Sequence, residues 1–177
     1  MNDFRIIKNQ LSGLSFAEQY RFLYQTIAVL CEEQGIKDPF SYARSKEILA
    51  AIELGHTVAD EFSGADAIDE NGEEVEYKST IDKRCKGAYT GISVQPTWEE
   101  QVKYLREEKL LKYNRHFYNR FADGRLVESW SLTGQQVYDI LLPKLEKAYA
   151  RVSTLKDPRL AASVSWTEIK NNGVRVL

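Results

Sequence analysis

The sequence predicts an α/β fold, with a mixed central β-sheet flanked by helices and an N-terminal helical layer. Three observations support this prediction. Apolar residues recur at helical spacing in residues 1–55, strand-like segments with Asn-Gly and Asp-Gly turns fill much of residues 56–132, and helical patterns interrupt and follow those strands. The chain has 177 residues, 43% hydrophobic and 28% charged, which is typical of a globular domain. We expect one domain over residues 1–177, with a helical part at 1–55, an α/β core at 56–150 and C-terminal strands or a tail at 151–177.

The N-terminal part contains two predicted helices. Residues 15–18, Ser-Phe-Ala-Glu, form a capping box, and apolar side chains follow at helical spacing from Phe16 to Leu30. Gly35 is expected to end this helix. A second helix is predicted to begin after residue 39 or 41 and to end at Gly55.

The middle of the chain alternates between strands and helices. We expect strands at residues 56–62, 65–69, 73–81, 88–94, 113–121 and 125–132, with hairpins around Glu70-Asn71-Gly72 and Asp123-Gly124. We expect helices at residues 98–111 and from residue 133 onward, each opened by a capping box. Pro143 falls inside the second of these helices and is expected to kink it. Residues 160–177 are expected to add one or two strands.

The composition argues against several classes of site. Cys31 and Cys85 are too few for a disulfide framework or a structural zinc site, and His56 and His116 leave little for a histidine-rich metal site or a Ser-His-Asp triad. No apolar run is long enough to cross a bilayer, and residues 1–5 lack the basic head and apolar block of a secretion signal. We therefore expect a cytoplasmic protein with no membrane partner.

The charges are unevenly distributed along the chain. Residues 60–76 contain eight acidic residues and no basic one, whereas residues 103–120 contain six basic and two acidic residues. Between them, residues 78–89 carry four basic residues and one acidic residue. An acidic block followed by basic ones is suited to a site that holds metal ions and grips a phosphate backbone, although solvated surface charge explains any single run equally well.

Asp66, Glu76 and Lys78 are the candidate catalytic residues. Magnesium prefers carboxylate ligands, and a lysine ammonium beside it can orient an attacking water or neutralise charge on a phosphate. Glu76 and Lys78 are two apart in a predicted strand and so share a face. Asp66 joins them only if the hairpin loop is the three residues Glu70-Asn71-Gly72, because a two-residue loop would place the carboxylates on opposite faces. We predict the three-residue loop.

The segment from Gly64 to Gly72, continuing through Glu76-Tyr77-Lys78-Ser79, resembles the active-site hairpin of the PD-(D/E)xK restriction endonucleases. The similarity extends to Lys86-Gly87 and Thr90 and, more loosely, over residues 45–148. This resemblance implies a single nuclease domain with a restriction-endonuclease-like core. It also implies a type II site-specific deoxyribonuclease that uses one or two Mg²⁺ ions.

The resemblance also implies roles for individual residues. Asp66 and Glu76 would be Mg²⁺ ligands, the Tyr77 carbonyl an additional one, and Lys78 the residue that positions the nucleophilic water. Some family members add a carboxylate from the preceding helix, for which Glu47 is the candidate. An ordinary exposed helix glutamate explains Glu47 equally well.

Residues after the predicted lysine are candidates for contact with DNA, although each is also an ordinary surface residue type. They are Lys83, Arg84, Lys86, Tyr89, Thr90 and Ser93. A similar member of the family carries base-reading histidines after the matching threonine, whereas this chain has Gly91-Ile92-Ser93, so the recognition sequence cannot be transferred. Residues 113–120 interleave aromatic, Asn and Arg side chains, which suits either nucleic-acid contact or an amphipathic strand.

The expected partners are double-stranded DNA and a second copy of the chain, because palindromic sites call for two-fold symmetry. The stripe from Phe16 to Leu30 is a candidate dimer element, with a core role as the simpler explanation. Four alternatives remain open: a homing endonuclease, a junction-resolving or repair nuclease with the same core, a DNA-binding α/β domain without catalysis, and an α/β interaction domain whose acidic hairpin is only solvated.

Overall fold

The computed structural model describes residues 4–59, 64–152 and 158–177. The chain divides into two compact units, residues 1–45 and 46–177, and each is described by itself. In the first unit, α1 spans Phe4–Gln10 and α2 spans Phe16–Glu33. The predicted capping box of α2 is confirmed, since the Ser15 side chain accepts from the Glu18 N–H and the Glu18 carboxylate accepts from the Ser15 N–H. Helix α1 was not predicted from the sequence.

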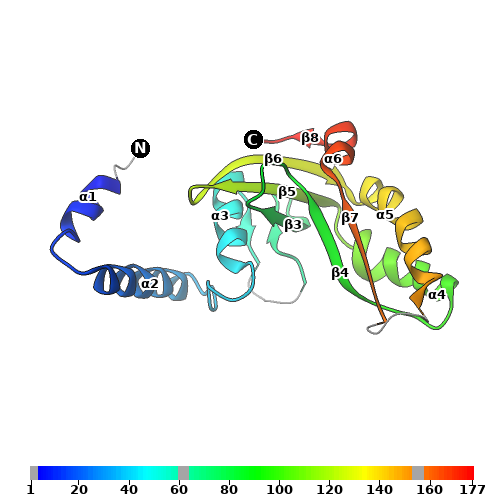
Figure 1. Cartoon of the computed structure of the whole chain (residues 1–177), viewed down its shortest axis with the longest axis horizontal. Helices are drawn as coiled ribbons and strands as arrows, with labels where there is room; N and C mark the ends of the chain where they lie inside the picture. The colour runs from blue at the N-terminus through cyan, green and yellow to red at the C-terminus, as the bar shows by residue number, and fades with distance from the viewer. Residues whose placement is uncertain (1–3, 60–63, 153–157) are drawn as a thin grey trace. The chain divides into compact units, whose positions relative to one another are not determined.

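The second unit is built on a mixed six-stranded sheet (Figure 1), which confirms the predicted α/β class. The spatial order of the strands is β1 (Thr57–Val58), β2 (Ala67–Ile68), β3 (Glu74–Thr80), β5 (Arg115–Ala122), β6 (Arg125–Thr133) and β8 (Val174–Arg175). β3 and β5 are parallel, and the other neighbours are antiparallel. Of the strand predicted for residues 56–62, only Thr57 and Val58 form a strand among the described residues. Residues 60–62 lie outside the described residues.

The crossover between β3 and β5 contains β4 (Gly87–Ser93), α4 (Trp98–Tyr104) and the π-helix η1 (Leu105–Leu110). A long crossover is required because parallel strands cannot be joined by a tight turn. β4 leaves the central sheet and pairs with β7 (Arg159–Val164) in a separate antiparallel ribbon. The predicted helix at 98–111 is present, but its second half is wound as η1.

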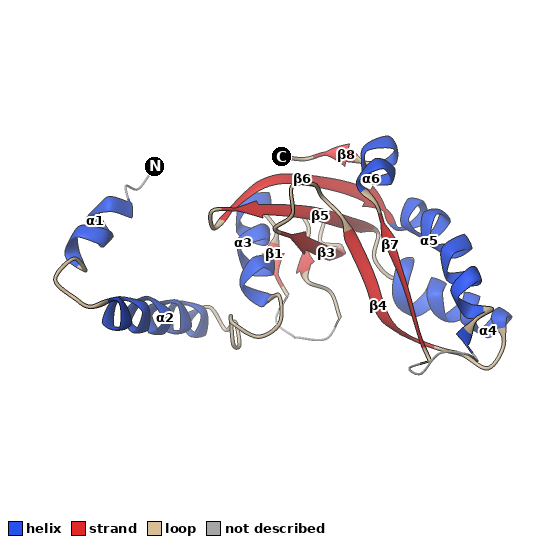
Figure 2. Ribbon diagram, viewed as in Figure 1, coloured by secondary structure: helices blue, strands red, loops and turns tan. Residues whose placement is uncertain are grey.

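The sheet of the second unit has helices on both sides (Figure 2). On one side, Ala50 and Ala51 of α3 (Arg44–Leu54) pack with Val75, Tyr77 and Phe117. We call this side the α3 face. On the other side, α5 (Gly134–Tyr149) and the β4–β7 ribbon pack on a larger core that includes Tyr118 and Leu132. We call this side the cleft face.

The C-terminal part also departs from the prediction. β7 and β8 supply the two expected strands, but α6 (Trp166–Asn172) lies between them. Its capping box, Ser165 with Glu168, is visible in the sequence and was overlooked. α5 continues through Pro143 as one helix. Among the described residues, no helix is long and apolar enough to span a membrane.

Candidate active site

The β2–β3 hairpin brings Asp66, the residue just before β2, beside β3. Ala67 is paired with Val75 and Ile68 with Glu74, and the Asp66 N–H donates to the Val75 carbonyl at 3.0 Å. At the tip, the Asp69 N–H donates to the Glu73 carbonyl at 2.9 Å, which leaves residues 70–72 as a three-residue loop. Gly72 has φ of 81°, the left-handed conformation that glycine adopts without strain. The predicted three-residue loop and the pairing at Ala67 and Ile68 are therefore confirmed, whereas at Asp66 the N–H bonds to Val75 and not to Glu76, the predicted partner.

The alternation of β3 separates charged from apolar side chains. Tyr77 packs in the core of the α3 face, where its hydroxyl lies 2.7 Å from His56 Nδ1. Glu76 and Lys78 lie on the cleft face, and the Lys78 ammonium forms a salt bridge with the Glu76 carboxylate. Their side chains are 17% and 20% exposed, so they remain open to solvent while being largely desolvated.

The Asp66 carboxylate lies close to two other carboxylates. Its Oδ2 accepts a hydrogen bond of 2.6 Å from the Tyr77 N–H. Burial, and then the negative charges of Glu76 and Glu47, raise the pKa of Asp66 to about 8. Lys78 opposes this shift only weakly. A site that disfavours its own negative charge in this way is stabilised when a cation enters it.

The donor set is suited to magnesium. Among residues 4–59, 64–152 and 158–177, no three side chains of His, Cys, Asp or Glu form a group able to hold a metal ion. Asp66 and Glu76 are the two predicted carboxylate ligands, and the Tyr77 carbonyl is the third predicted ligand. Zinc would require more protein ligands, whereas magnesium retains several waters and takes one or two carboxylates. Glu47 acts on Asp66 through its charge, from α3.

A cleft of about 400 Å³ opens over Glu76 and Lys78. The rest of its lining comes from residues 88–92 of β4, from residues 108–110 of η1, and from Gly64 and Tyr113. These are Gly64, Ala88, Tyr89, Thr90, Gly91, Ile92, Glu108, Lys109, Leu110 and Tyr113. The cleft therefore has one wall from the ribbon and one from the π-helix.

The sequence analysis missed Tyr113, Glu108 and Lys109 as residues of this cleft. Burial, and then the negative charges of Glu76 and Asp66, raise the pKa of Tyr113. Both predicted catalytic carboxylates therefore interact electrostatically with its hydroxyl. Lys109 and Tyr113 belong to the basic and aromatic run at residues 103–120, which was the available signal. Their position depends on η1, which the sequence pattern does not reveal.

The candidates for DNA contact fall into two groups. Lys83, Arg84 and Lys86 are exposed in the loop before β4, where they line a second hollow of about 780 Å³ together with residues 163–166. Lys86 is paired with Asp82. Thr90 and Ser93 are exposed on β4.

Tyr89 differs from the other candidates because it is 8% exposed and its hydroxyl is hydrogen-bonded inside the protein. The expected contact between this hydroxyl and DNA is not compatible with its burial. The alternative of an amphipathic strand for residues 113–120 is wrong, because Phe117 and Tyr118 lie in the cores on opposite faces of the sheet, so β5 is buried on both sides.

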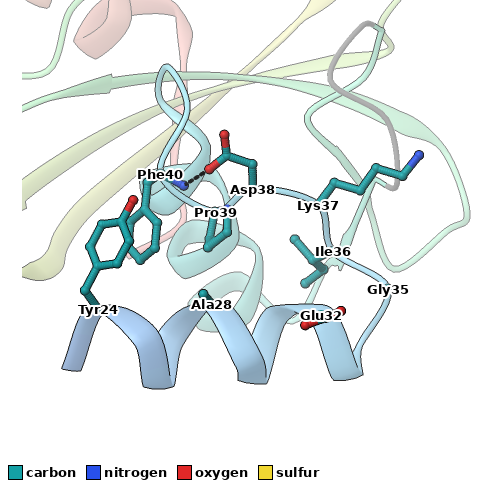
Figure 3. A pocket seen from close by; sticks show the side chains of 9 residues that line it. All are labelled: Tyr24, Ala28, Glu32, Gly35, Ile36, Lys37, Asp38, Pro39 and Phe40. Carbon is teal, nitrogen blue, oxygen red and sulfur yellow. Dashed lines mark hydrogen bonds between the residues drawn. The ribbon is translucent and has the colours of Figure 1, made fainter. Parts of the chain in front are cut away.

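The first unit has a groove of its own, of about 590 Å³, where residues 35–40 fold back along α2 (Figure 3). Tyr24 stacks on Phe40 at one end, with ring centroids 3.8 Å apart. Glu32 and Lys37 are the charged side chains at the other end, and the Lys37 side chain extends away from the groove in Figure 3. The lining of this groove includes one lysine and two acidic residues, Lys37, Glu32 and Asp38.

No protein-family model matches the chain, and no curated protein is significantly similar to it in sequence. Inference about function therefore depends on the chemistry of the site.

Proposed function

We propose that this chain is a Mg²⁺-dependent endonuclease that hydrolyses phosphodiester bonds of double-stranded DNA. The observation that carries the proposal is the proximity of the Asp66 and Glu76 carboxylates beside Lys78. The charge of Glu76 raises the pKa of Asp66, and Glu76 and Lys78 line the cleft. The resemblance of this hairpin to PD-(D/E)xK restriction endonucleases supports the same conclusion and implies products with 5′-phosphates.

The residues of the site have separable tasks. Asp66 and Glu76 would hold the metal, and Lys78 would hold the attacking water and neutralise charge on the phosphate. A bound Mg²⁺ would polarise the scissile phosphate and the water that attacks it. The raised pKa of Asp66 fits this arrangement, because the cation would supply the positive charge that Lys78 alone does not.

The surroundings of the cleft suit a duplex. The β4–β7 ribbon borders the cleft, and a two-stranded ribbon fits the major groove of B-DNA. Its exposed face carries small and polar side chains in cross-strand pairs, Ala88 with Ser163 and Ser93 with Arg159. These let the ribbon approach base edges closely. Lys83 and Arg84, exposed at the start of the ribbon, are placed for phosphates.

A homodimer is the assembly that fits cleavage of both strands at a palindromic site. Helix α2 carries Phe16, Tyr20, Leu23, Ile27 and Leu30 at alternating spacings of four and three, and each is at least 43% exposed. This spacing forms the kind of apolar seam that packs against a second helix. Restriction is the biological setting that we propose.

The test is cleavage of plasmid and phage DNA in Mg²⁺ and in chelator, followed by sequencing of the ends. We expect cutting in Mg²⁺ alone, at a short fixed site. A long asymmetric site would indicate homing, and cutting that depends on DNA structure would indicate repair. Lys78→Ala should abolish cutting, with Lys147→Ala, an exposed lysine on α5, as the matched control. Binding to DNA that is unaffected by Mg²⁺, with no cutting, would refute the proposal.

A further inference from the structure

Three buried side chains beside the cleft form a continuous hydrogen-bonded group. His116 Nε2 lies 2.9 Å from the Leu110 carbonyl, which can only accept, so Nε2 carries the proton. Burial lowers the pKa of His116 to about 4, so the ring is neutral and its Nδ1 is an acceptor. The Tyr89 hydroxyl oxygen lies 3.0 Å from His116 Nδ1 and donates its hydrogen bond to this nitrogen.

The second hydrogen-bond partner of the Tyr89 hydroxyl is the hydroxyl of Tyr118. The two hydroxyls are 3.0 Å apart, and because Tyr89 donates to His116, it accepts from Tyr118. Tyr118 and His116 are both fully buried on β5. The Tyr89 ring is thus fixed at its outer end by two side chains that cannot move without disturbing the core.

The face of the fixed ring contacts Lys78. The Lys78 Nζ lies 4.9 Å from the centroid of the Tyr89 ring, within the range of a cation–π interaction. Gly87, on the same strand as Tyr89, brings β4 against the stem of Lys78. A Cβ at Gly87 would collide with the Tyr118 ring and come within 3.1 Å of Lys78 Cγ.

We propose that Tyr89 is a positioning residue for Lys78, held in place by His116 and Tyr118. This inference rests on the proposed function and deepens it. Glu76 is a poor permanent holder of the ammonium, because a cation bound at Glu76 would draw the carboxylate away from Lys78. An aromatic ring is uncharged and does not compete for the cation, so Tyr89 would retain Lys78 when Glu76 is engaged.

The test compares Tyr89→Leu, which removes the ring, with Tyr89→Phe, which removes only the anchoring hydroxyl. Tyr149→Phe is the matched control, because the Tyr149 hydroxyl donates one hydrogen bond of 2.9 Å to the Gln95 carbonyl outside the cleft. The first readout is the NMR shift of the Lys78 ε-methylene protons, assigned by their absence in Lys78→Arg. We expect an upfield ring-current shift in the wild type, a smaller one in Tyr89→Phe and none in Tyr89→Leu.

The second readout is the split between kcat and KM on cleaved DNA. Loss of positioning should lower kcat roughly tenfold or more in Tyr89→Leu and less in Tyr89→Phe, with KM unchanged. Tyr149→Phe should alter neither readout. If Tyr89→Leu does not fold, the wild-type shift and the Tyr89→Phe variant decide the question.

The inference is overturned if the Lys78 protons are unshifted in the wild type, or if folded Tyr89→Leu cleaves at the wild-type kcat. The NMR readout needs no cleavage. A wild-type protein that shows the shift but never cuts DNA would therefore refute the proposed function while the contact stands. A protein that cuts DNA equally well with and without the ring would refute the positioning role alone.

Discussion

The two faces of β3 use alternate residues of one strand in opposite ways. On the α3 face, Val75 and Tyr77 are at most 4% exposed and pack with Phe117 and α3. On the cleft face, Glu76 and Lys78 are charged, paired with each other and still open to solvent. The first pattern is what a stable core requires. The second leaves two charges partly desolvated, which costs free energy that their mutual salt bridge only partly offsets.

This difference indicates that stability and function are carried by different sides of the same strand. A substitution on the cleft face should remove activity with little loss of stability. A substitution on the α3 face should lower stability, while the folded protein keeps its activity.

Asp66→Asn should lower the rate of DNA cleavage by about a thousandfold or more, because it removes a predicted metal ligand. Stability should be unchanged or higher, because an uncharged amide replaces a carboxylate that burial and two neighbouring carboxylates disfavour. Single-turnover cleavage and urea unfolding measure the two quantities. Asp139→Asn, an exposed aspartate on α5, is the control. Equal losses of activity and stability would contradict the separation of the faces.

Phe117→Ala should cost about 3–5 kcal/mol of unfolding free energy, because it leaves a cavity in the core of the α3 face. Phe117 is 1% exposed and packs edge-on against Tyr77 and His56. Phe117→Leu should cost clearly less, since it retains most of the apolar volume. Urea unfolding measures both variants. A cost below about 1 kcal/mol for the alanine variant would show that this face is not the stabilising one.

Stability without metal should depend on pH through Asp66. Its pKa is raised from 3.8 to about 8, so the folded state binds this proton more tightly than the unfolded state. The stabilisation is complete below pH 3.8 and is lost as the pH rises to about 8. We therefore expect Mg²⁺ to raise the Tm more at pH 8 than at pH 6. Asp66→Asn should remove this difference, and thermal unfolding in chelator and in Mg²⁺ measures it. A Mg²⁺ effect that is equal at both pH values would contradict it.

The sequence was sufficient to predict the elements whose signals are local. Capping boxes at Ser15, Thr97 and Thr133 marked the starts of α2, α4 and α5. The Asp123-Gly124 turn was predicted, and both residues have positive φ, as a two-residue hairpin turn requires. The β2–β3 hairpin was predictable for the same reason, since alternation and loop length together determine its register.

What the sequence could not predict depends on contacts between distant segments. β4 has an ordinary strand pattern, and nothing in it shows that its partner is β7 rather than the central sheet. Tyr89 could be identified as buried only once His116 and Tyr118 were placed beside it. The π-helix η1 has the same amphipathic residues as an α-helix, so the presence of Glu108 and Lys109 in the cleft was not foreseeable.

The smallest expected effect on stability comes from a substitution at Gly72, in the turn that joins β2 and β3. Gly72→Ala should cost about 1 kcal/mol of unfolding free energy, because Gly72 has φ of 81° and a side chain there is strained even in open space. Gly13→Ala is the matched control, since that exposed glycine has an ordinary φ and open space around it, and it should cost nothing measurable.

Cleavage by Gly72→Ala should stay close to the wild-type rate. A slip of one residue would bury Glu76 and Lys78 in the α3 face and expose Tyr77, which costs far more than the strained turn. The register is therefore expected to be held by the contrast between the two faces, and the glycine only eases the turn. If Gly72→Ala abolished cleavage while the protein remained folded, the turn rather than the alternation of β3 would be what aligns Asp66 with Glu76.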